Sequence, residues 1–198
     1  MESNIIEITK IKTINFIEVN DKPIEKIVGT EDIINYISSS LLSVIQNNKK
    51  MKLKPSKGPN EPLYSKMIPV LPLKKFLLRI IKYTEAENNT LIVAYLYIIK
   101  LIKAENFILS LNNIYRILLG SVVLAKKFLE DINFNNLYFC QIGGMTVQEL
   151  NSVEFSLFVR INFDANPKIE EVNDIYKNII YSLASSKKKE YSNIADNL

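Results

Sequence analysis

Hydrophobic residues recur at every third or fourth position through most of the chain, and short polar stretches interrupt the pattern. This spacing places apolar side chains on one face of an α-helix, so it predicts amphipathic helices rather than strands. The predicted helices cover residues 30–46, 73–84, 88–102, 111–128, 147–161 and 167–183. The segment 111–128 is apolar on most sides, which indicates a buried helix with the others packed around it. The predicted fold is therefore all-α.

Polar residues mark where several of these helices begin. Thr30 and Ser110 are predicted N-caps, because a hydroxyl can accept a hydrogen bond from a free amide of the first turn. Thr146 and Glu149 have the spacing of a capping box, in which the hydroxyl serves the N3 amide and the carboxylate serves the N-cap amide. The Gly-Gly pair just before this box predicts a sharp turn with a positive φ.

The two ends and one internal loop differ from the helical part. The first 29 residues carry competing strand and helix signals, so we expect a loosely attached arm. Residues 47–61 are rich in Lys and contain Pro and Gly, which predicts a loop; it could bind phosphate groups, but a solvated loop is the simpler expectation. The chain is expected to divide into an N-terminal arm, helix and Lys-rich loop (1–62), a central helical domain (63–165), and a C-terminal helix with a charged tail (166–198).

Composition excludes several kinds of chemistry. The sequence has no His and one Cys, Cys140, so it cannot form a Ser-His-Asp or Cys-His catalytic centre, a His-ligated metal site or an internal disulfide. The formal net charge of +4 does not by itself indicate nucleic-acid binding. No stretch resembles a signal peptide or is long and apolar enough to span a bilayer. We therefore expect an intracellular protein of the cytoplasm, the nucleus or both.

The remaining residues do not predict an enzyme. The acidic pairs Glu130–Asp131 and Glu170–Glu171 are adjacent in sequence, so on a helix their side chains point about 100° apart and are expected to be solvated. The Gly-Gly pair lacks the Lys and the Ser or Thr of a phosphate-binding loop. We expect no cofactor, no metal and no small-molecule substrate, and the residues alone predict a helical binding module.

A series of short motifs narrows this interpretation. Six motifs follow one another between residues 68 and 163. The first three are Arg-Ile-x-Lys-Tyr (Arg79–Tyr83), Leu-Asn-x-x-x-Arg (Leu111–Arg116) and Leu-Ala-x-Lys-Phe-x-x-Asp (Leu124–Asp131). The last three are Asn136, the Gly-Gly pair (Gly143–Gly144) and Glu-Leu-Asn-x-x-Glu (Glu149–Glu154). The series resembles the cyclin box of the P/U-type cyclins, which are related to the fungal phosphate-starvation cyclins. Only about 35 residues follow Phe163, too few for a second box.

The resemblance implies a single cyclin box, a five-helix bundle around a buried central helix, with flanking N- and C-terminal helices. It also implies a partner, a cyclin-dependent Ser/Thr protein kinase that the chain binds and activates without being catalytic itself. In that family a Lys late in the third helix and a Glu in the fourth grip the kinase around its C-helix, and the motifs place these residues at Lys127 and Glu154. We expect the two side by side, next to an apolar groove lined from the third and final helices.

One alternative stays open. The chain could be a cyclin-like helical adaptor or a nucleic-acid-binding module, with Lys49–Lys57 and Lys187–Lys189 as its basic contacts. The two hypotheses differ in salt dependence, because affinity for a nucleic acid falls steeply as salt is added. The kinase hypothesis predicts no specific nucleic-acid binding.

Overall fold

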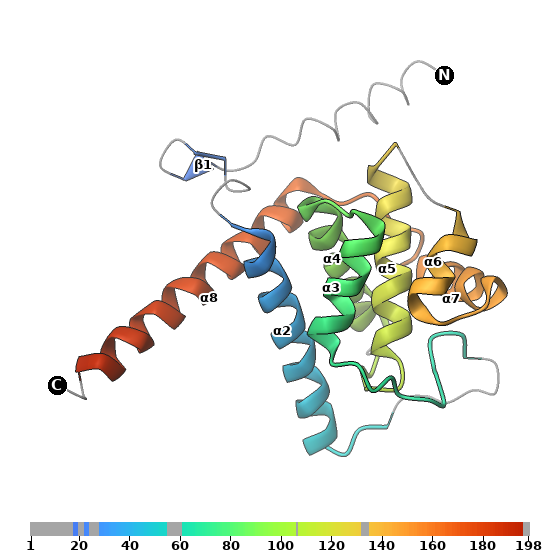
Figure 1. The fold of residues 1–198 in the computed structure, drawn as a ribbon, viewed down its shortest axis with the longest axis horizontal. Helices are drawn as coiled ribbons and strands as arrows, with labels where there is room; N and C mark the ends of the chain where they lie inside the picture. The colour runs from blue at the N-terminus through green and yellow to red at the C-terminus, as the bar shows by residue number, and fades with distance from the viewer. Residues whose placement is uncertain are drawn as a thin grey trace.

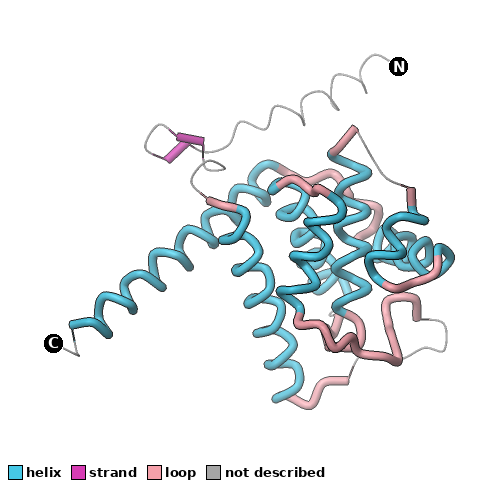
Figure 2. The backbone as a smooth tube through the Cα atoms, viewed as in Figure 1, coloured by secondary structure: helices cyan, strands magenta, loops and turns pink. Residues whose placement is uncertain are grey.

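The structure is a computed structural model of the 198-residue chain. It describes residues 18–19, 22–23, 28–54, 61–105, 107–131 and 135–195. Apart from two short antiparallel strands, β1 (Glu18–Val19) and β2 (Lys22–Pro23), the described elements are helices (Figure 1 and Figure 2). The helices are α2 (Thr30–Lys50), α3 (Leu73–Thr84), α4 (Asn88–Glu105), α5 (Ile114–Leu129), α6 (Asn136–Gly143), α7 (Val147–Arg160) and α8 (Ile169–Ala195). The predicted all-α fold is confirmed.

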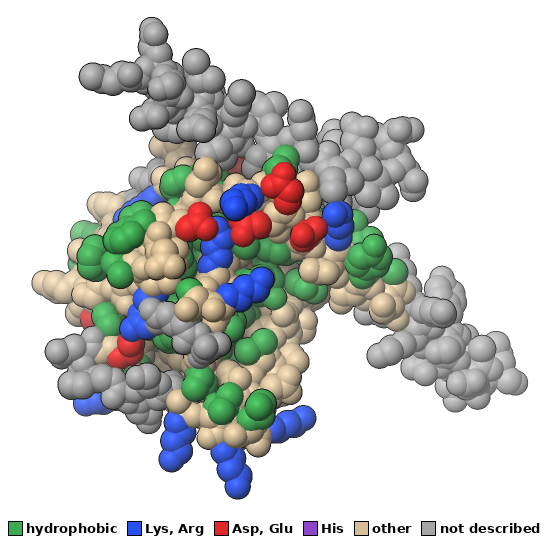
Figure 3. All heavy atoms as spheres, turned by 180° about the vertical axis from the view of Figure 1, so that it is seen from behind, with side chains coloured by type: hydrophobic (Ala, Val, Ile, Leu, Met, Phe, Trp, Pro, Cys, Tyr) green, Lys and Arg blue, Asp and Glu red, His purple; other side chains and the backbone are tan. Residues whose placement is uncertain are grey.

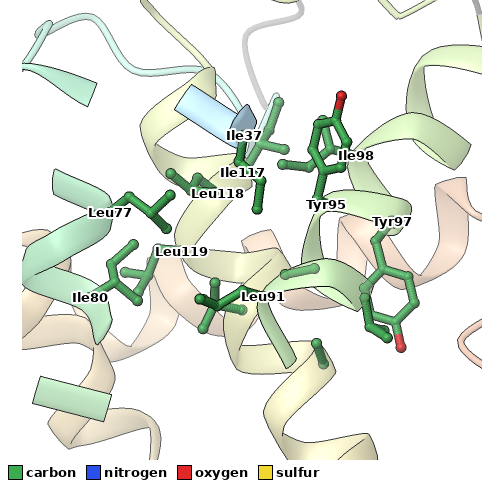
Figure 4. Packing of buried hydrophobic residues seen from close by; sticks show 14 of the residues in the cluster. Ile37, Leu77, Ile80, Leu91, Tyr95, Tyr97, Ile98, Ile117, Leu118 and Leu119 are labelled. Atoms are coloured by element: carbon green, nitrogen blue, oxygen red, sulfur yellow. The ribbon is translucent and has the colours of Figure 1, made fainter. Parts of the chain in front are cut away.

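Helix α5 lies at the centre of the bundle. It packs against α3, α4, α6 and α7, and from Ile114 to Lys126 every residue except Arg116 is buried. Figure 4 shows Ile117 and Leu118 of this helix among buried side chains of α2, α3 and α4. The buried central helix that the apolar pattern predicts is therefore confirmed.

Helix α7 lies close to α5 at Gly120. A Cβ atom added at Gly120 would lie 2.6 Å from Cγ1 of Val153 and 2.8 Å from Cδ1 of Leu157, well inside the normal separation of packed carbon atoms. The missing side chain therefore lets α5 and α7, the helices that carry Lys127 and Glu154, pack directly on each other.

The five helices α3 to α7 match the number that the cyclin-box resemblance implies. The apolar pattern missed α6, because a helix of eight residues is too short to show its period. The side chain of Asn135 caps its start by accepting a hydrogen bond from the amide of Tyr138 at 3.0 Å. The helix ends at Gly144, whose φ of +63° lies in the left-handed region that glycine adopts most readily. The predicted turn is thus confirmed at Gly144, whereas Gly143 is still helical.

Helices α2 and α8 flank the box, as expected. Helix α2 packs against α3, α4 and α8 and buries Ile33 and Ile37 among other residues, so it is part of the packed structure; it runs on to Lys50. Helix α8 continues through the segment from Ser185 that was expected to be a charged tail, as far as Ala195. That segment contains no Gly or Pro and is rich in good helix formers, and Figure 1 shows it extending away from the bundle.

Two predicted N-caps are wrong, by one and by three residues. Gly29, not Thr30, is the N-cap of α2. The hydroxyl of Thr30 instead lies 2.8 Å from Oδ1 of Asn88, to which it donates a hydrogen bond, and this joins the first turns of α2 and α4. The N-cap of α5 is Asn113, whose side chain accepts a hydrogen bond from the amide of Ser110 at 2.9 Å and so stabilises a turn before the helix.

The linker between α2 and α3 is fastened to the box from residue 61 onward. Leu63 is fully buried. The amide of Ser65 donates to the carbonyl of Asn112 at 2.7 Å, and the Asn112 side chain donates back to the Ser65 carbonyl at 2.9 Å. The hydroxyl of Tyr115 donates to the carbonyl of Leu71 at 2.7 Å. Residues 55–60 of the predicted Lys-rich loop, and most of the predicted N-terminal arm, lie outside the described residues.

Candidate functional site

Lys127 and Glu154 form an ion pair between α5 and α7. The Nζ atom of Lys127 lies 2.8 Å from Oε1 and 2.7 Å from Oε2 of Glu154, so it donates to both carboxylate oxygens. The Lys and Glu side chains are 34% and 18% exposed. The expected pairing is therefore present, although Glu154 lies on the fifth helix of the box rather than the fourth, because α6 intervenes.

Asn136 joins a third helix to this pair. Its side-chain nitrogen donates to Oε2 of Glu154 at 3.0 Å and to Oδ1 of Asn151 at 2.6 Å. Asn136 is the first residue of α6, so these bonds tie the start of α6 to the middle of α7. The motif series contains Asn136 but assigns it no role, because that role depends on how α6 and α7 pack against each other.

Lys126, next to Lys127, anchors the end of α5. It is buried and pairs with Glu130 one turn later, and Oε1 of Glu130 accepts a hydrogen bond from the hydroxyl of Thr90 at 2.6 Å. The expectation that Glu130 is solvated is wrong, because the end of α5 packs on the first turn of α4 and covers the carboxylate. These bonds hold the turn of α5 from which Lys127 projects.

Aromatic side chains lie next to the pair in sequence and along α7. Phe128 follows Lys127 and is exposed. Phe158 is four residues after Glu154, so it lies on the same face of α7 one turn further on. The ring of Phe163 contacts the ring of Phe158 edge to face, with centroids 5.0 Å apart, and Phe163 is 59% exposed. Phe158 and Phe163 therefore form an aromatic stripe that follows Glu154 along α7, half-buried at Phe158 and exposed at Phe163.

Phe163 has an unusual backbone conformation. Its φ is +59°, and that of Asn162 is +55°, a region that bulky residues rarely occupy. The amide of Phe163 donates to the carbonyl of Phe158 at 2.9 Å, which closes the end of α7. Strained backbone of this kind is concentrated at functional sites. No sequence signal pointed to this residue.

The prediction of an apolar groove lined from the third and final helices is wrong. Helix α8 packs against α4 and α2, so it is placed away from Lys127 on α5. An open hollow of about 490 Å³ lies instead on the outer side of α7, lined by Pro62, Ser152, Phe155, Ser156, Val159 and Arg160. The exposed apolar side chains around the pair therefore belong to the box itself.

The first turn of α7 is fixed by charged groups. The predicted capping box is confirmed: the Glu149 amide donates to the Thr146 hydroxyl at 3.1 Å, and the Thr146 amide donates to Oε2 of Glu149 at 2.9 Å. Arg116 contacts the other carboxylate oxygen of Glu149 at 2.5 Å. The hydrogen bond from the Thr146 amide, followed by the one from Arg116, lowers the pKa of Glu149 below its ordinary value.

The other groups singled out in the sequence do not join the site. Lys49, Lys50, Lys52 and Lys54 are exposed, while Lys57 and the side chains of Lys187–Lys189 lie outside the described residues. Cys140 is a buried free thiol. Asp131 and Glu170 are exposed as expected, but Glu171 lies 3.4 Å from the Lys100 ammonium. Within the described ranges, no cluster of acidic or Cys side chains could hold a metal ion, and no helix is long and apolar enough to cross a membrane.

Comparisons with known proteins agree with this architecture. A sequence model of the family described as Cyclin matches residues 30–165, more than half of the chain. The chain is 30% identical to Cyclin-U4-2 of Arabidopsis thaliana over 107 residues and 34% identical to Cyclin-U2-1 of the same organism over 97 residues. It is 31% identical to Cyclin-P4-1 of Oryza sativa subsp. japonica over 99 residues.

These matches cover only part of each protein. They include 54%, 48% and 50% of this chain, and 50%, 44% and 47% of the three relatives in the same order. The chain therefore spans about half the length of the curated relatives it matches. The family match begins at Thr30, so it takes in α2 as well as α3 to α7.

Proposed function

The chain belongs to the cyclin family and to its P/U type, and we propose that it binds and activates a cyclin-dependent Ser/Thr protein kinase. Family membership gives the chain a regulatory role. The observation that carries the finer proposal is the surface ion pair of Lys127 and Glu154. In this proposal the chain supplies no catalytic group, needs no cofactor, and acts in the cytoplasm, the nucleus or both.

The ion pair is suited to orient a partner. Both side chains keep some exposure, and an ammonium has three donors while a carboxylate has about four acceptor positions. Each group therefore retains bonding capacity beyond the pair. Asn136 holds Glu154 from the α6 side, so the charges are in place before a partner arrives. Charges held in this way fix the register and the specificity of an interface.

The aromatic stripe next to the pair would supply affinity. Phe128 and Phe163 are exposed in the free chain, and full burial of such a side chain is worth roughly 1.5–3 kcal/mol. Aromatic anchors grouped near polar or charged contacts are typical of interface hot spots. The stripe and the pair together form a surface that fits an amphipathic segment of a kinase.

Activation would follow from binding one state of the kinase more tightly than the other. A protein kinase is active when its C-helix is turned inward, because the helix Glu then pairs with the Lys that contacts ATP. A partner that contacts only the inward position shifts the equilibrium toward it. The cyclin would thus act through the kinase C-helix and not on the substrate.

The test uses single substitutions at the pair. The cyclin-dependent kinases of the source organism are purified one by one and assayed with the parent chain at limiting concentration. Lys127→Ala and Glu154→Ala should each reduce the affinity for the cognate kinase by about thirtyfold or more, because each leaves an unpaired charge in the interface. Melting temperatures should stay close to that of the parent, since exposed pairs contribute about 0–1 kcal/mol.

Lys177→Ala is the matched control. It breaks an exposed ion pair with Asp174 on α8 and should change neither kinase activation nor melting. The residue assignment fails if Lys127→Ala or Glu154→Ala activates the kinase like the parent. The function itself fails if no kinase binds while an oligonucleotide binds with steep salt dependence, which is the behaviour of a nucleic-acid-binding module.

A further inference from the structure

One end of the bundle carries an exposed surface made of two segments, which we call the end surface. Residues 49–54 form the end of α2 and the turn after it, and residues 66–70 lead into α3; every residue of both segments is exposed. Their hydrophobic side chains are 43% to fully exposed (Met51, Leu53, Met67, Ile68 and Val70). Exposed apolar side chains that are grouped rather than scattered mark an interaction site.

The turn before α5 links the two segments. The side chain of Asn48 donates to the carbonyl of Leu109 at 3.0 Å, which joins the end of α2 to that turn. The amide of Ser65 donates to the carbonyl of Asn112 at 2.7 Å, which joins the same turn to the second segment. Leu111, between these contacts, is also exposed. Figure 1 places the end of α2 and the chain that enters α3 at the lower end of the molecule, where Figure 3 shows Lys or Arg side chains beside hydrophobic ones.

The end surface is basic. It contains five exposed lysines (Lys49, Lys50, Lys52, Lys54 and Lys66). Between residues 46 and 84 the sequence has a single acidic residue, Glu61. The carboxylate of Glu61 lies 2.7 Å from the guanidinium of Arg160, and its side chain is only 11% exposed. This stretch of chain therefore presents positive charge with almost no exposed negative charge.

The second segment is held in its exposed position. The Ser65 hydroxyl accepts a hydrogen bond from the Met67 amide at 3.2 Å and donates one to the Met67 carbonyl at 2.8 Å. The Tyr115 hydroxyl holds the carbonyl of Leu71 at 2.7 Å, and the ring of Pro69 between these contacts fixes its own φ. The apolar side chains are thus presented outward by an ordered backbone, so a ligand that covers them pays little ordering entropy.

The combination of lysines and aliphatic side chains specifies the class of ligand. Each Lys close to an anionic bilayer raises the affinity about fivefold, and the boundary between headgroups and acyl chains takes up apolar side chains. The bases of a nucleic acid bind by stacking on aromatic rings, but none of the hydrophobic residues of the end surface is aromatic. Lysine is depleted in protein–protein interfaces. An anionic lipid surface therefore fits better than either alternative.

We propose that the end surface is a peripheral binding site for anionic phospholipid bilayers. Its lysines contact the headgroups, and Met67 and Val70 insert at the boundary with the acyl chains. The surface lies at the start of α5, whereas Lys127 projects about 20 Å further along the helix at 1.5 Å per residue. The pair of Lys127 and Glu154 therefore lies away from the bound membrane. The proposal does not depend on kinase binding.

The direct test measures sedimentation of the full chain with vesicles of phosphatidylcholine that contain about 30% phosphatidylserine. The parent should bind them at least about tenfold more tightly than vesicles of phosphatidylcholine alone, and added salt should weaken this binding. One variant changes four lysines of the end surface to Gln and should bind about tenfold more weakly (Lys49, Lys50, Lys52 and Lys54). The control changes four exposed cations elsewhere to Gln and should bind like the parent (Arg79, Lys82, Lys168 and Lys177).

A fluorescent reporter tests insertion of the apolar side chains. The chain contains no Trp, so one introduced Trp reports its own surroundings. The emission of the Met67→Trp variant should shift to shorter wavelengths with the phosphatidylserine vesicles, because the ring enters the apolar boundary. Tyr181→Trp, at a 69% exposed position on α8, should show no shift. A double variant with Met67→Ser and Val70→Ser should bind about fivefold more weakly and melt like the parent.

Four results would overturn the lipid site. The first is no binding of the parent to the phosphatidylserine vesicles. The second is an equal loss of affinity in both charge variants, or no shift for Met67→Trp, which would mean unspecific attraction between charges. The third is tighter binding of single-stranded DNA or polyglutamate, lost in the variant of the end surface, which would assign the surface to a nucleic acid or an acidic protein. The fourth is loss of kinase activation in solution by that variant, which would place the end surface in the kinase interface.

Discussion

At position 120 a missing side chain decides how closely the two helices of the site approach. Gly120→Ala would push a methyl group against Val153 and Leu157, so we expect a loss of about 1–3 kcal/mol in the free energy of unfolding, measured with urea. Ser121→Ala in the next position is the control, because the Ser121 hydroxyl is buried without a hydrogen-bond partner among the described residues; it should be neutral or stabilising. Equal effects of the two changes would contradict the close-approach argument.

Asn136 should act through Glu154. We expect Asn136→Ala to lower the free energy of unfolding more when it is made in the parent chain than when it is made in the Glu154→Ala variant. The difference between the two effects, which is the coupling energy, should be about 0.5–1.5 kcal/mol, the usual net contribution of a hydrogen bond. The bond from Asn136 to Asn151 is present in both backgrounds and cancels in the double-mutant cycle. A coupling of zero would show that the 3.0 Å contact has no energetic role.

Glu149 predicts a pH dependence of stability. Its pKa is lowered in the folded state from an ordinary value of 4.5, so the unfolded chain binds the proton more readily. The stabilisation from this group is therefore complete above pH 4.5 and is lost as the pH falls from there through the folded pKa. Glu149→Gln should remove this part of the acid destabilisation, which urea titrations at several pH values would measure.

At the scale of elements, the sequence predicted the helices that have a long apolar repeat and missed the one that does not. Helices α2, α3, α4, α5 and α7 were anticipated because their apolar stripes run over several turns. Helix α6 has eight residues and depends on packing against α3, α5 and α7. The length of α8 was underestimated because a Lys- and Ser-rich composition was interpreted as a tail, although composition alone does not end a helix.

Helix α2 should behave as part of the folding unit. Ile37 of this helix is fully buried against the core (Figure 4), so Ile37→Ala should cost about 2–5 kcal/mol in the free energy of unfolding. Asn35→Ala changes an exposed side chain on the same helix and should cost much less. An equal, small effect of both changes, with one unfolding transition, would mean that α2 is not packed as the structure has it.

At the scale of the whole molecule, the face drawn in Figure 3 carries charged side chains of both signs beside exposed hydrophobic ones, so neither charge nor hydrophobicity alone marks a site on that face. The order of the motifs predicted that Lys127 and Glu154 lie side by side, and the ion pair between them confirms this. Their surroundings could not be predicted in the same way. The contact from Asn136 depends on the angle between two helices, and the exposure of Phe163 depends on two successive left-handed residues that the sequence does not signal.

Phe163 offers a test in which stability and function separate. Phe163→Gly removes the edge-to-face contact with Phe158, which lowers the free energy of unfolding by about 0.5–1.5 kcal/mol. It also relieves the strain of a positive φ at this position, which raises the free energy of unfolding by about 1–2 kcal/mol. The free chain should therefore melt close to the parent. Kinase affinity should fall by about tenfold or more, because an exposed aromatic anchor is lost. Asn162→Gly relieves the same kind of strain without removing a ring, so it should leave kinase affinity unchanged. If Phe163→Gly binds the kinase like the parent, the aromatic stripe lies outside the interface, and the strained turn serves only to end α7.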